Sequence, residues 1–155
     1  VTVSANAKRR TFTITTTPVS SSVPVTIRAE AFGVTRSTEV TVVRAALVSF
    51  TITPNEVIGP GTATGEVTLS GPAPEGGFVV TILGGGGLVT APASVTVAAG
   101  TTTRSFEITY RLFTGGSGGV VRSAHVNITA TADGVSKTAG LTLLSVRPGL
   151  HPRGV

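Results

Sequence analysis

The side chains that could hold a metal ion are scattered along this chain. Its carboxylates are Glu30, Glu39, Glu56, Glu66, Glu75, Glu107 and Asp133. Calcium takes about six to eight oxygen ligands, usually with several carboxylates close together, and these residues are isolated from one another in sequence. His125 is expected on the outward face of a strand and His151 in a C-terminal tail. We therefore predict solvated carboxylates and no bound metal or cofactor.

A catalytic nucleophile or acid–base pair would need supporting groups around it. The chain has no Cys, and its many Ser and Thr residues fall on the outward phase of predicted strands, where hydroxyls are ordinary sheet residues. The Gly-rich stretches 84–87 and 115–119 lack the strand-to-helix context and the Gly-Lys-Ser/Thr ending of a phosphate loop. The sequence predicts no catalytic residue and no enzyme.

An isopeptide bond between Lys137 and Asn127 is a further chemical possibility, because the two residues lie on adjacent predicted strands. Such a bond forms beside a buried carboxylate. Asn127 and Glu66 are expected to face outward, and the first copy of an internal repeat, described below, has Thr26 and Arg36 at the equivalent places. No cross-link is predicted.

Sugar binding is the main alternative to a purely structural role. Glycan sites on sandwich domains usually lay aromatic rings against the sugar faces. This chain has no Trp and only Tyr110 as tyrosine, and Phe78 and Phe106 are expected in the core. Residues 127–129 fit the short acceptor pattern for N-glycosylation, which arises often by chance.

Charge and composition exclude other classes of partner. Only 12% of residues are charged, and apart from Lys8, Arg9 and Arg10 the basic residues are spread singly, so no basic stripe points to nucleic acid. No apolar run approaches the roughly 18 to 20 residues of a membrane helix, so no membrane insertion is expected. Val1 is neither an initiating Met nor the start of a signal peptide, and we expect upstream residues to have been removed.

An internal repeat organises the chain. Residues 1–15 and 95–109 are identical at eight of fifteen positions, and residues 22–42 align with 123–143. The offset grows from 94 to 101, which places a seven-residue insertion in the Gly-rich stretch that follows Tyr110. An insertion of this kind is typical of a surface loop, where added length costs little.

Apolar residues alternate with polar ones in both copies, which predicts strands with one inward face. The second copy has Val95/Val97, Phe106/Ile108, Val126/Ile128/Ala130 and Leu141/Leu143; the first has Val1/Val3, Phe12/Ile14, Val25/Ile27/Ala29 and Val40/Val42. Gly33 and Gly134 fall between the last two strands and predict a hairpin in each copy. Three further strands are expected from Leu47, Thr64 and Phe78.

These strands predict an all-β fold, an immunoglobulin-like antiparallel β-sandwich with one complete unit preceded by a partial unit. The complete unit covers residues 47–146 with seven strands. The partial unit covers residues 1–46 and has strands D-E-F-G but lacks A-B-C. The connection between them has no Gly or Pro, which favours a stiff rod. Residues 147–155 are expected to form a flexible tail or an extended arm.

Stretches such as 53–83, 92–109 and 126–143 resemble the tandem immunoglobulin-like repeats of large bacterial surface and secreted proteins, and more weakly Calx-beta domains. The resemblance implies an extracellular or cell-surface location and a stalk, adhesive or assembly role. The acidic turn ligands of Calx-beta domains are missing, since Asp133 is the only Asp.

The partial unit predicts an assembly surface, because strands without partners would leave an apolar face uncovered. Its residues are Val1, Val3, Phe12, Ile14, Val25, Ile27, Ala29, Val40 and Val42. Either neighbouring repeats of the same polypeptide cover this face, or another subunit does so by strand addition and builds a head-to-tail filament. We expect a non-catalytic structural protein; a glycan- or surface-binding adhesion module is the alternative.

Overall fold

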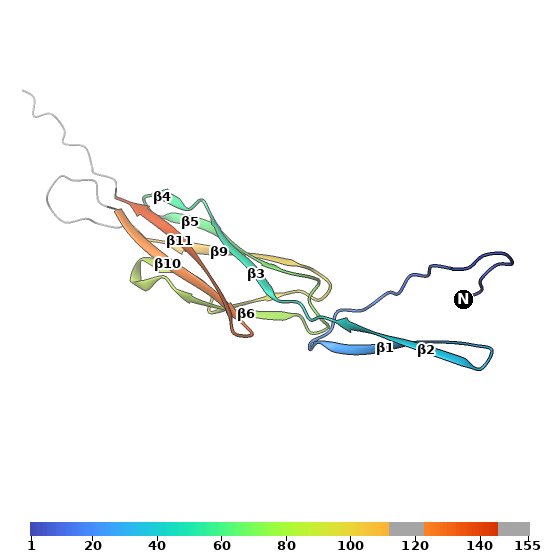
Figure 1. Ribbon diagram of the computed structural model, residues 1–155. Coiled ribbons are helices and arrows are strands. Elements are labelled where there is room, and N and C mark those ends of the chain that lie inside the picture. The colour runs from blue at the N-terminus through green and yellow to red at the C-terminus, as the bar shows by residue number, and fades with distance from the viewer. Residues whose placement is uncertain (112–122, 146–155) are drawn as a thin grey trace, which may run out of the picture.

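The structure is a computed structural model that describes residues 1–111 and 123–145. Figure 1 shows a β-sandwich with a two-stranded hairpin and residues 1–22 extending from one end of it. The described residues contain no α-helix, only the short 3-10 turn η1 (Gly86–Leu88). Within these ranges, no helix is long and apolar enough to cross a membrane. The predicted all-β sandwich is confirmed.

Two sheets build the sandwich. One has the order β4 (Glu56–Ile58), β11 (Val135–Leu144), β10 (Ser123–Ala132), β6 (Phe78–Gly84) and β8 (Ser94–Val97). The other has the order β3 (Leu47–Thr53), β5 (Gly61–Leu69), β9 (Thr103–Tyr110) and β7 (Val89–Thr90). All seven strands predicted for this unit are present, and β4 and β7 are two short additions.

One strand pair breaks the antiparallel pattern. β4 runs parallel to β11, with Glu56 opposite Thr142 and Ile58 opposite Leu144. The backbone N–H of Thr142 also donates to the carbonyl of Asn55 at 2.8 Å. β3 begins the sandwich, and β4 follows it in the chain. Through β4, the beginning of the sandwich therefore pairs directly with β11, the strand that ends it.

The core lies between the two sheets and follows from the alternation. Val67 and Ile108 from one sheet and Val80, Ile128 and Leu141 from the other are fully buried. Phe50 and Phe106 stack with ring centroids 6.0 Å apart. Gly65 makes room for this pair, because a Cβ on it would lie 2.7 Å from the Phe106 ring.

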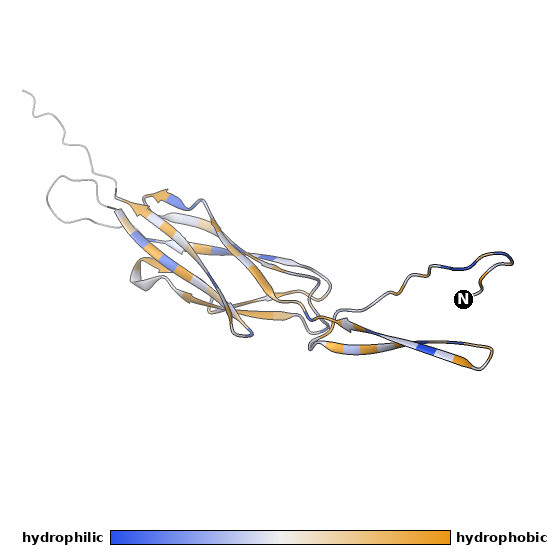
Figure 2. Ribbon diagram, in the orientation of Figure 1, coloured by the Kyte–Doolittle hydropathy of each residue, from blue (hydrophilic) through white to orange (hydrophobic). Residues whose placement is uncertain are grey.

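The N-terminal hairpin consists of β1 (Val23–Ala31) and β2 (Val34–Val42), which pair antiparallel. Figure 2 shows apolar residues alternating with polar ones along β1. The predicted turn is confirmed: Phe32 and Gly33 both have positive φ, at 51° and 76°. Two central residues with positive φ suit the twist of a hairpin.

Residues 1–22 depart from the prediction, because they contain no strand. The strands predicted at Val1/Val3 and Phe12/Ile14 are wrong, although the same sequence pattern forms β8 and β9 in the second copy. In that copy β8 pairs with β6 and β9 pairs with β5. The first copy has no counterparts of β5 and β6, and a strand without a ladder partner leaves its backbone groups to water.

Candidate functional site

The carboxylates of the described residues do not gather into a cluster that could hold a metal ion. Over residues 1–111 and 123–145, no three His, Cys, Asp or Glu side chains come close enough to hold a metal ion. Glu66 accepts a hydrogen bond from the hydroxyl of Ser105 at 3.0 Å on an exposed sheet face. No group of these side chains within the described ranges has the arrangement of a metal site.

Lys137 and Asn127 occupy opposite faces of the β10–β11 hairpin. Lys137 pairs with Ala130, whose side chain is fully buried, whereas Asn127 pairs with Gly140 and is exposed. Successive residues of a strand alternate between faces, so the two side chains point away from each other. This geometry cannot form the isopeptide bond.

His125 lies on the outward face of β10, as predicted. Its Nδ1 is 3.2 Å from the hydroxyl of Thr142, and its ring lies over Gly140, where a Cβ would come within 2.5 Å of Cε1. Its contacts are thus with a hydroxyl and a glycine backbone. His151 lies outside the described residues.

The aromatic rings of the sandwich offer little surface to a sugar. Phe50, Phe78 and Tyr110 are buried, and Phe106 is half-buried against the core. The exposed aromatic side chains in the described part of the chain are Phe12 and Phe32, both N-terminal to the sandwich.

One face of the N-terminal hairpin carries a row of partly exposed apolar side chains. Cross-strand pairing places Val23 beside Val42 and Val25 beside Val40, with Ile27 next along the same face. We call these five residues the hairpin face. Ile14, residues 15–17 and Val19 lie along it and leave a groove of about 350 Å³. No residue from 1 to 44 is buried.

The structure gathers only part of the predicted assembly set. Val25, Ile27, Val40 and Val42 share the hairpin face, and Ile14 lines its groove. Ala29 follows on the same side of the hairpin, opposite Arg36. Val1, Val3 and Phe12 do not line this groove; Val1 and Phe12 line a separate depression nearer the N-terminus.

Val23 of the hairpin face and Val19 of its groove were not among the predicted assembly residues. Val23 continues the alternation of Val25 and Ile27 by one step, so the period of two could have included it. Val19 lies in a segment without alternation, and its place beside the hairpin depends on how the chain turns back at residues 20–22.

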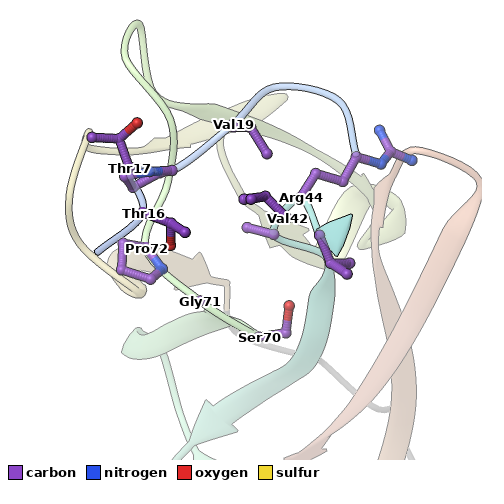
Figure 3. A pocket seen from close by; sticks show the side chains of 11 residues that line it. Thr16, Thr17, Val19, Val42, Arg44, Ser70, Gly71 and Pro72 are labelled. Atoms are coloured by element: carbon purple, nitrogen blue, oxygen red, sulfur yellow. The ribbon is translucent and has the colours of Figure 1, made fainter. Parts of the chain in front are cut away.

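The junction between hairpin and sandwich is tied by several polar contacts. The Ala46 N–H donates to the Ser70 hydroxyl at 3.0 Å, and the Ser70 N–H donates to the Ala46 carbonyl at 2.9 Å. The Arg44 guanidinium lies 2.8 Å from the Asp133 carboxylate. Figure 3 shows the pocket beside these contacts, of about 290 Å³, with Val42 and Arg44 on one side and Pro72 on the other.

Replacing Asp133 by asparagine is expected to loosen this junction without unfolding the sandwich. Both charged side chains are about two-fifths exposed, and exposed ion pairs contribute at most about 1 kcal/mol. Asn also tolerates the positive φ of 49° at this position. We expect the β1–β2 amides to tumble with a shorter correlation time in ¹⁵N relaxation measurements, and high salt to do the same to the unaltered protein.

Glu30→Gln is the matched control, because Glu30 lies 3.8 Å from Arg28 within the hairpin and its replacement removes one carboxylate away from the junction. Equal relaxation of the hairpin amides in Asp133→Asn and in the unaltered protein would show that the ion pair does not hold the two parts together.

No protein-family model matches the chain, and no curated protein matches it.

Proposed function

We propose that this chain is a non-catalytic structural protein of the extracellular space or cell surface, either a stalk repeat or a filament subunit joined head to tail by strand complementation. The observation that carries the proposal is the hairpin face. Five large apolar side chains on one side of a two-stranded hairpin form a surface suited to a partner, since an isolated hairpin is marginally stable in water.

The junction supports the same proposal. A short connection with one side-chain-to-backbone hydrogen bond, one backbone hydrogen bond and an ion pair orients the hairpin relative to the sandwich. Proteins built from repeats extend through such nearest-neighbour contacts. The extracellular location rests on the resemblance to bacterial surface repeats.

The glycan-binding alternative has less support. Sugar-binding surfaces depend on exposed aromatic rings, and the aromatic side chains described for the sandwich contribute to its core. Phe12 and Phe32 are exposed but belong to the N-terminal part.

The intact mass of the native material, combined with electron microscopy, tests the proposal. Fibres built from a polypeptide of 15.5 kDa support the filament subunit, and a longer polypeptide that contains this sequence supports the stalk. A monodisperse native monomer of 15.5 kDa that binds to a glycan array would overturn the structural role and favour the adhesion module.

A further inference from the structure

We propose that the hairpin face is the docking surface for a second strand set equivalent to β3, β4, β5 and β6, presented without a β10–β11 hairpin of its own. This inference rests on the proposed structural function and narrows it: it agrees with the stalk repeat and disagrees with a filament in which intact copies of this chain cover the hairpin face. Four observations within the chain support it.

The two hairpins have the same construction in the backbone. Val25 pairs with Val40, and 101 residues later Val126 pairs with Leu141. The turns also agree, because Phe32 and Gly33 have φ of 51° and 76° while Asp133 and Gly134 have 49° and 78°. β1–β2 is therefore the register-matched counterpart of β10–β11.

The two hairpins also agree on one face and differ on the other. On the inward side, five of ten positions are identical, namely Val25/Val126, Ile27/Ile128, Ala29/Ala130, Ala31/Ala132 and Val34/Val135. On the outward side, two of ten are identical, Ser22/Ser123 and Thr41/Thr142. The side that packs in the second copy is the side that the first copy retains.

The second copy displays what this side packs against. β6 pairs with the edge of β10 from Ile128 to Thr131, β4 pairs with β11, and β3 contacts β11. Ile128 and Leu141 are fully buried as a result. In the described part of the chain, the equivalent edge at residues 27–30 and the equivalent side chains Ile27 and Val40 have no such cover.

Residues 1–22 lack ladder partners equivalent to β5 and β6. Their counterparts β8 and β9 are held by β6 and β5. One strand set that includes equivalents of β5 and β6 would therefore give ladder partners to residues 1–3 and 9–16. The same strand set would cover the hairpin face. An intact second copy of this chain offers no such place, because its β3 and β6 already contact its own β10–β11 hairpin.

A grafted chain tests the inference. Residues 47–94 are fused directly before Val1, because Val95 aligns with Val1 and the joint then has the spacing of the second copy. We expect the amides of residues 27–30 to exchange hydrogen at least about a hundredfold more slowly than in the 155-residue chain, since their opening then requires unfolding of a cooperative unit.

The control is the same graft with Asp in place of the grafted copy of Val80, whose original is fully buried; it should leave these amides fast. A second measurement is the effect of Ile27→Ala, which should become strongly destabilising in the grafted chain only. Unchanged exchange at residues 27–30 in a graft whose original sandwich is folded would overturn the inference.

The unaltered chain supplies the competing outcome. If it forms dimers in sedimentation and the amides of residues 27–30 are protected in them, the occupant is a second intact copy and the inference is wrong. These amides report on the hairpin face alone, whereas the proposed function is judged by native mass, fibres and glycan binding. The two proposals can therefore fail separately.

Discussion

Replacing Ile128 by alanine is expected to lower the free energy of unfolding by about 4 kcal/mol, because the lost methyl groups leave a cavity between well-packed sheets. The same change at its repeat counterpart Ile27 is expected to cost less than about 1 kcal/mol, because little contact is lost where a side chain is already partly in water. Ile128 is fully buried, whereas Ile27 lines the open groove of the hairpin face. Urea unfolding followed by circular dichroism measures both.

The comparison is well controlled, because the two residues are identical and occupy matching register positions, opposite Ala139 and Thr38. Apart from this cross-strand neighbour, the two sites differ in what covers the side chain. A loss at Ile27 as large as that at Ile128 would contradict the uncovered hairpin face.

Replacing Gly84 by alanine is expected to destabilise the sandwich by about 3 kcal/mol. Gly84 has a φ of 109° and lies at the end of β6 against β10, where a Cβ would press on the carbonyl oxygen of Asn127 and come within 3.2 Å of the Ile128 Cα. Backbone atoms cannot move aside as a flexible side chain can, so steric overlap adds to the strain of positive φ. Thermal unfolding of the purified variant gives the change.

Gly86→Ala gives the cost of a positive φ in the left-handed region without a close contact. Gly86 also has a positive φ, of 49°, but a Cβ at this position would meet no atom within 4 Å. Its replacement should cost about 1 kcal/mol, the strain of the backbone conformation alone. Equal effects at Gly84 and Gly86 would mean that the close approach of β6 to β10 is not a constraint.

The sequence predicts those elements whose partners are near in the chain. β10 and β11, like β1 and β2, are joined by a two-residue turn with Gly, so alternation and turn chemistry together specify the pair. The residues of the hairpin face follow from the same period. Their exposure can be predicted only from the observation that the first copy has no counterparts of β5 and β6.

Alternation alone failed where the partner is distant or absent. Residues 1–3 and residues 95–97 are both Val-Thr-Val. Only residues 95–97 lie in a strand, because β6 pairs with them. The three residues of β4 are too few to carry a periodic signal. The Arg44–Asp133 ion pair joins two residues far apart in sequence, and no local pattern marks such a contact.

The parallel pairing of β4 with β11 determines how the sandwich responds to tension. The chain enters the sandwich at Leu47, in β3, and leaves it through Leu144, in β11. β4, which follows β3, runs in the same direction as β11. Pulling on both ends therefore drags β4 and β11 past each other in opposite senses. Their hydrogen bonds, including the one from Thr142 to Asn55, span the gap between the strands. They are loaded together in shear instead of being peeled apart one by one, which is the arrangement that resists stretching.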